Sequence, residues 1–208
     1  MVSDWLVAVA CGLGAYLLGS VPTAYIVVRL GIGRDIRRLG SGNVGATNTF
    51  QQAGVLLGSL VMLADTGKGV LAVLAPVWVG APHWAMFVTT TLTLIGHNWP
   101  VFLRFRGGKG VAVIFGASLS LVPWLTLAAL APAILVIVKA RNVTVGATLG
   151  MGLLNVLIIA TGQSLDRIAL CLFLTFLVSA TYLVSIRHQL RSAAKSRRWR
   201  DLFLDTDI

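Results

Sequence analysis

Long apolar runs alternate with short polar segments along the whole chain. The apolar runs cover residues 5–28, 52–81, 84–103, 111–138, 143–162 and 168–186. A helix needs about 20 apolar residues to cross a bilayer, and all of these runs except 111–138 have the length for a single helix each. We interpret 111–138 as two short or tilted helices that turn at Pro123. The pattern predicts an all-α polytopic membrane protein with about seven transmembrane helices.

Polar or helix-breaking residues interrupt two of these runs. Pro22 is expected to bend the first helix near its end, because proline removes a helical hydrogen bond. Asp65 and Lys68 lie near the middle of the second run, where ionisable side chains usually face a polar interior. Their i,i+3 spacing allows them to pair on one helix face. Such a pair is equally consistent with a structural role and with a functional one.

The positive charges predict the orientation of the chain in the membrane. The segments 29–48, 104–110 and 139–142, together with the tail from Arg187, contain 15 of the 17 lysines and arginines. Cytoplasmic connections carry such an excess, so we expect these segments inside, the N-terminus outside and the C-terminus in the cytoplasm. If 111–138 were instead a re-entrant hairpin, the chain would cross five times.

Composition supports a membrane protein of one domain. Hydrophobic residues make up 57% of the chain and charged residues 12%, against about 25% charged in soluble domains. We therefore expect residues 1–208 to form a single integral membrane domain surrounded by lipid. The net charge is +10, but the basic residues stand at the ends of the spans, which excludes a nucleic-acid-binding face.

The longest segment that is neither apolar nor charged is the loop 40–48. Its glycines and short polar residues are Gly40, Ser41, Gly42, Asn43, Gly45, Thr47 and Asn48. Successive backbone N–H groups in such a loop can form a concave anion nest. We interpret the loop as a phosphate-binding element beside the membrane. The alternative is a plain connector, because Gly and Asn are ordinary turn residues.

A second candidate for anion binding follows the third apolar run. Gly107, Gly108 and Gly110 allow a sharp turn around Lys109. The lysine presents a point charge, while Arg104 can hold a phosphate with two hydrogen bonds. The spacing is not that of a Walker A loop. A basic stop signal after the span is the alternative reading.

The histidines and cysteines narrow the chemistry further. His83, His97 and His188 are the only histidines, and no cluster of His, Cys and carboxylates has the spacing of a metal site. We therefore expect neither a metal nor a cofactor. The chain also lacks a His-x4-Asp pair and a Gly-x-Ser-x-Gly nucleophile elbow. His188 remains the one convincing general base, unless a phosphate oxygen of the substrate takes the proton.

Several motifs together resemble one enzyme family over nearly the whole chain. They are Gly19-Ser20-Val21-Pro22-Thr23, the loop 40–48, Asp65-x-x-Lys68-Gly69, the stretch from Gly96-His97 through Pro100 and Phe102 to Gly110, and the terminal Arg187-His188. The chain is similar to the PlsY-type bacterial acyl-phosphate:glycerol-3-phosphate acyltransferases. The resemblance implies a seven-span inner-membrane enzyme whose site faces the cytoplasm. It further implies acyl phosphate and glycerol 3-phosphate as substrates and lysophosphatidic acid as product.

The same resemblance implies roles for individual residues. Ser41, Lys109 and His188 are the implied catalytic residues. The expected substrate-binding residues are Gly40, Gly42, Asn43, Gly45, Thr47, Asn48, Lys68, Arg104, Gly107, Gly108, Gly110 and Arg191.

The chain departs from the family pattern at three places. Gln51 stands where the family usually has arginine, the segment 143–147 has less Ser and Ala than usual, and the residues after His188 differ. Arg191 is our candidate for restoring the missing cation. These departures leave two alternatives to the enzyme: a weakly active or silent membrane scaffold, and a small anion transporter.

Overall fold

Helices joined by short connections make up the part of the chain that the structure, a computed structural model, describes. Residues 4–196 are described, and of the side chains after Val184 only that of Ile186 is included. The elements are α1 (Asp4–Ser20), α2 (Thr23–Ile32), the short 3₁₀ helix η1 (Ile36–Arg38), α3 (Ala46–Trp78), α4 (Ala85–Asn98), the 3₁₀ helix η2 (Val101–Leu103), α5 (Val111–Leu121), α6 (Pro123–Ala140), α7 (Val143–Ala160) and α8 (Leu165–Ser196). Within residues 4–196 no strand occurs, which confirms the predicted all-α class.

Five helical segments within the described residues are long and apolar enough to cross a membrane. They are 4–32, which combines α1 and α2, followed by 46–78, 123–140, 143–160 and 165–184. Helices α4 and α5 have 14 and 11 residues. At 1.5 Å per residue they are shorter than the roughly 30 Å apolar layer of a bilayer. The predicted membrane-protein class is confirmed, while the count of seven crossings stays a prediction.

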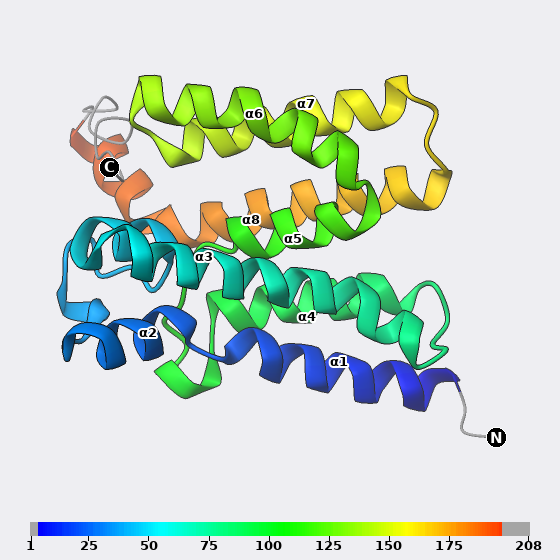
Figure 1. Ribbon diagram of the computed structural model, residues 1–208, viewed down its shortest axis with the longest axis horizontal. Helices are drawn as coiled ribbons and strands as arrows, with labels where there is room; N and C mark the ends of the chain where they lie inside the picture. The colour runs from blue at the N-terminus through cyan, green and yellow to red at the C-terminus, as the bar shows by residue number, and fades with distance from the viewer. Residues whose placement is uncertain (1–3, 197–208) are drawn as a thin grey trace.

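The helices lie side by side, and the polar connections gather at one end of the bundle. Figure 1 shows α1 beside α4, α3 beside α5, and the α6–α7 hairpin at the opposite edge beyond α8. The connections 33–45, 99–110 and 141–142 all lie at the end of the bundle where α8 finishes. The connections 79–84 and 161–164 lie at the other end. The fold therefore brings the candidate anion-binding loops to a common end.

Helix breaks occur at the prolines that the sequence indicated and at one further residue. The first run divides around Val21 and Pro22, and Pro123 starts α6 directly after α5. Helix α3 runs without a break through Asp65–Gly69, but it is kinked at Gly54, whose φ of 86° lies in the left-handed region. This backbone conformation is open to glycine and strained for other residues.

Glycines bring α3 and α5 into close contact. A Cβ at Gly69 would overlap the carbonyl oxygen of Val113, and a Cβ at Gly116 would overlap that of Thr66. Small residues at helix crossings let membrane helices approach through their backbones. Because α5 starts directly after Gly110, this contact fixes the base of the second candidate loop against α3.

Candidate active site

The buried side chain of Asn48 organises the loop 40–48. Its Nδ2 donates to the carbonyl oxygens of Leu39 and Asn43, both at 3.0 Å. Its Oδ1 accepts a hydrogen bond of 3.3 Å from the backbone N–H of Ser41. Asn48 thus satisfies the loop backbone from inside, and the loop keeps a fixed shape at the start of α3.

The outer surface of this loop is available to a ligand. Gly40 and Gly42 have φ angles of 49° and 71°, which turn the chain back over Asn48. Ser41 is exposed, and its Oγ accepts from the N–H of Asn43 at 3.4 Å. Gly45 is the N-cap of α3 and supplies no side-chain cap. The first N–H groups of α3 are therefore suited to an anion, as at other helix N-termini.

An arginine of η1, just before the loop 40–48, is held by a carboxylate. Arg37 forms an ion pair of 2.7 Å with Asp35 and lies 4.9 Å above the centre of the Tyr25 ring. The hydrogen bond from Arg37 lowers the pKa of Asp35 to about 2. The carboxylate accordingly keeps its charge at neutral pH, and the pair anchors η1 next to the loop 40–48.

The turn 107–110 rests directly on the end of α4. The N–H groups of Gly107 and Gly108 donate to the carbonyl oxygens of Asn98 and His97, both at 3.1 Å. A Cβ at Gly107 would overlap the His97 carbonyl oxygen, and one at Gly108 would overlap the His97 ring. Both positions therefore require glycine because the turn is packed against α4.

Lys109 projects from this turn toward α8. Its Nζ lies 5.4 Å from the centre of the Tyr182 ring, and the side chain is half-buried. Gly110 follows with a φ of 78° and is the N-cap of α5. The lysine charge is thus presented where the turn, the first residues of α5 and α8 meet.

A buried polar network lies beneath both loops. Asp65 Oδ1 accepts hydrogen bonds from Thr23 Oγ1 at 2.6 Å and from Lys68 Nζ at 2.8 Å. Lys68 Nζ also donates to the carbonyl oxygen of Val21 at 2.6 Å and to Thr23 Oγ1 at 3.4 Å. The predicted pair of Asp65 and Lys68 is confirmed, and it holds the break between α1 and α2 against α3.

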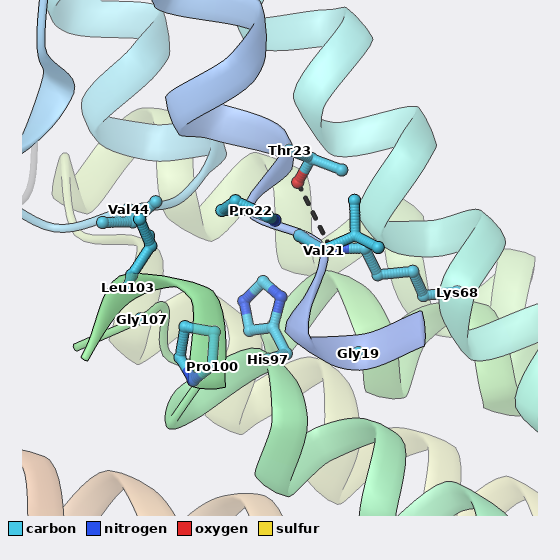
Figure 2. A pocket seen from close by; sticks show the side chains of 10 residues that line it. All are labelled: Gly19, Val21, Pro22, Thr23, Val44, Lys68, His97, Pro100, Leu103 and Gly107. Carbon is cyan, nitrogen blue, oxygen red and sulfur yellow. Dashed lines mark hydrogen bonds between the residues drawn. The ribbon is translucent and has the colours of Figure 1, made fainter. Parts of the chain in front are cut away.

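His97 connects this network to the turn 107–110. Its Nδ1 lies 3.6 Å from Asp65 Oδ1, and its ring contacts Gly108, as described above. Figure 2 shows the imidazole next to Pro100, with Lys68 extending toward Thr23. His97 therefore acts as a buried spacer between the ion pair and the glycine turn.

A small pocket shows that the two candidate loops meet. Its lining combines Val44 of the first loop with Gly107 of the second and with Lys68 and His97 below them (Figure 2). Val44 also packs with Leu103 of η2 in one hydrophobic cluster. Two loops separated in sequence by 58 residues are thereby joined at one end of the bundle.

Other predicted site residues lie apart from this pocket or outside the described part. Arg104 is exposed, with a left-handed φ of 53°, and Thr47 and Asn43 are half-buried. His188 and Arg191 lie on α8, but their side chains are outside the described part of the structure. Gln51 is exposed on the first segment of α3.

Two contacts of this region were not anticipated from the sequence. Thr23 stands in the first motif, but its bond to Asp65 joins residues 42 positions apart. Tyr182 lies inside an apolar run and belongs to none of the motifs. The sequence does not indicate that a single tyrosine in such a run lies at the site, because aromatic residues of apolar runs also face lipid or pack in the core.

Known glycerol-3-phosphate acyltransferases match this chain over most of its length. The model of the glycerol-3-phosphate acyltransferase family matches residues 9–193. A glycerol-3-phosphate acyltransferase of Clostridioides difficile is 39% identical, over 87% of this chain and 91% of that protein. A similarly named protein of Dehalococcoides mccartyi is 44% identical, and this match covers 68% of the chain but only 61% of the relative.

A solved structure shares the fold. The crystal structure of PlsY (YgiH), an integral membrane glycerol 3-phosphate acyltransferase in its glycerol 3-phosphate form, matches with a TM-score of 0.75 at 28% identity. The match covers 89% of this chain and 92% of that one. Fold and site together define the class of integral membrane acyltransferases. Within this class, the chain belongs to the glycerol-3-phosphate acyltransferase family, as its motifs indicated.

Proposed function

We propose that the protein transfers a fatty acyl group from acyl phosphate to the sn-1 hydroxyl of glycerol 3-phosphate. The hydroxyl oxygen forms an ester bond with the acyl carbon, and the bond between that carbon and the phosphate oxygen breaks. Lysophosphatidic acid and inorganic phosphate leave, and the hydroxyl proton passes through the candidate base His188 to the phosphate. The observation that carries this proposal is the junction of two anion-suited loops, 40–48 and 107–110, at one end of an apolar helical bundle.

The chemistry of the two substrates fits this junction. Each substrate carries a phosphate, so the reaction benefits from two anion-binding elements that hold the hydroxyl and the acyl carbon together. Lys109 and the N–H groups at the start of α5 bind the phosphate of glycerol 3-phosphate. The loop with Ser41 stabilises charge on the leaving phosphate of the acyl donor, and His188 is our candidate base. The acyl tail stays among the membrane helices.

An assay of the purified protein tests the donor. Acyl phosphate, acyl-CoA and an acyl carrier protein thioester are offered separately with glycerol 3-phosphate, and lysophosphatidic acid is measured. We expect product from acyl phosphate alone, because the chain lacks the His-x4-Asp pair of acyltransferases that use acyl-CoA. Product from a thioester but not from acyl phosphate would contradict the proposed donor. Failure with all three donors would favour the silent scaffold.

We also propose that residues 1–208 form a single domain embedded in a bacterial inner membrane, with the site facing the cytoplasm. The distribution of positive charge supports this orientation. In a variant lacking Cys11 and Cys171, single cysteines at Ser41, Lys109 and Ser192 should be protected from an impermeant thiol reagent added outside intact cells.

Two further positions complete the labelling experiment. A cysteine at Gln163 should react from outside, and so should one at Trp124 if α5 and α6 both cross the membrane. Protection at Trp124 together with reaction at Gln163 would indicate five crossings instead of seven. Labelling at Lys109 from outside would contradict the cytoplasmic site.

A further inference from the structure

Tyr182 joins three elements at the candidate site. The face of its ring lies 5.4 Å from Lys109 Nζ, within the roughly 6 Å over which an aromatic ring attracts a cation. Its hydroxyl lies 3.3 Å from Thr144 Oγ1 on α7. The hydroxyl of Tyr182 therefore links α8 to α7. The face of the same ring contacts Lys109, which lies just before α5.

We propose that Tyr182 is a positioning residue that holds the Lys109 ammonium ready to bind a substrate phosphate. Thr144 fixes the orientation of the ring in this arrangement. The inference rests on the proposed function, because it assigns Tyr182 a role in the binding of glycerol 3-phosphate through Lys109.

A lysine side chain is flexible, and ordering it on the ligand reduces affinity. A ring that orders the ammonium beforehand reduces this cost. A carboxylate partner would also order the ammonium, but it would compete with the phosphate for the positive charge. An aromatic face attracts the ammonium without carrying a negative charge of its own. Tyr182 therefore restrains Lys109 without adding a negative charge that would compete with an anion.

The first experiment separates the role of the Tyr182 ring from the role of its hydroxyl. Tyr182→Leu removes the ring, Tyr182→Phe keeps it, and Phe176→Leu removes an exposed aromatic from the same helix as a matched control. We expect Tyr182→Leu to raise the glycerol 3-phosphate Kd and KM about three- to thirtyfold. The kcat should change little, because uniform binding is lost. Tyr182→Phe should raise the glycerol 3-phosphate Kd by about twofold or less, and Phe176→Leu should bind as the wild type does.

The second experiment is a double-mutant cycle measured by binding, without turnover. Tyr182→Leu is combined with Lys109→Met, which keeps the length of the side chain and removes its charge. The effect of Tyr182→Leu on the glycerol 3-phosphate Kd should disappear in the Lys109→Met background, because coupled residues are not additive. An equal effect in both backgrounds, or a wild-type Kd in Tyr182→Leu, would overturn the proposal.

A folding control keeps the result interpretable. The unfolding temperature of each variant is measured in detergent, and Tyr182→Met replaces Tyr182→Leu if the latter unfolds early. A purely structural role would lower the unfolding temperature of the Leu and Met variants and leave the Kd of the folded fraction unchanged. A wild type that binds glycerol 3-phosphate but forms no product would contradict the proposed reaction, whereas the cycle would still decide the role of Tyr182.

Discussion

Lys109→Ala is expected to lower kcat/KM for acyl transfer by a factor of about 10² to 10³, because removing the cation that binds the phosphate of glycerol 3-phosphate costs about 2–5 kcal/mol. The lysine is the cation of the turn that rests on α4, and the glycines around it supply only backbone. Its charge cannot be replaced by the surrounding apolar residues. Steady-state kinetics with acyl phosphate and glycerol 3-phosphate measure the loss.

Lys109→Arg is the matched control for charge. A planar guanidinium does not reproduce a compact ammonium, so we expect only partial recovery in a turn whose two preceding glycines are packed against His97. Both variants should unfold at the wild-type temperature, because the side chain is half-buried and projects from a turn. Wild-type kinetics in Lys109→Ala would reduce the turn to a basic stop after the span.

Lys68→Met is expected to destabilise the protein by about 3–5 kcal/mol, the range for removing one partner of a buried ion pair. The side chains of Lys68 and Asp65 are 4% and 1% exposed, so the remaining carboxylate would stay buried without the positive charge of Lys68. Val21 would also lose the donor to its carbonyl oxygen at the break between α1 and α2. Thermal unfolding in detergent measures the change.

The double variant Asp65→Asn with Lys68→Met provides the control. It removes the isolated charge and keeps a side chain of similar size next to Thr23 and His97. We expect it to recover a clear part of the stability lost in Lys68→Met. If the single and the double variant unfold at the same temperature, the pair does not stabilise the fold through charge compensation.

Local physical chemistry accounts for the elements that were predicted from the sequence. Proline stiffness placed the breaks at Pro22 and Pro123, and helical spacing placed Asp65 next to Lys68. The third run was expected to continue to residue 103, but α4 ends at Asn98. Trp99 precedes Pro100, and the residue before a proline is disfavoured in the helical conformation. The kink at Gly54 was not anticipated, because a single glycine also occurs inside regular helices.

The assembly of the site depended on contacts that the sequence does not encode locally. The loops 40–48 and 107–110 were identified separately by glycines and polar residues, and helix packing brings them together. The role of His97 as a spacer follows from the overlap that a side chain at Gly108 would cause, which requires the packed structure. The proximity of Tyr182 and Lys109 likewise depends on how α8 lies beside the start of α5.

The ion pair of α3 also bears on how the chain enters the membrane. Asp65 and Lys68 are one helical turn apart, so they can neutralise each other as soon as this segment becomes helical, before α4 and His97 have been synthesised. A single charged residue at the centre of a helix opposes insertion by about 2.5–3.5 kcal/mol on the translocon scale. Pairing within one helix lets the insertion machinery receive a segment with no net charge, and Thr23 in the preceding span is already available to complete the polar contacts.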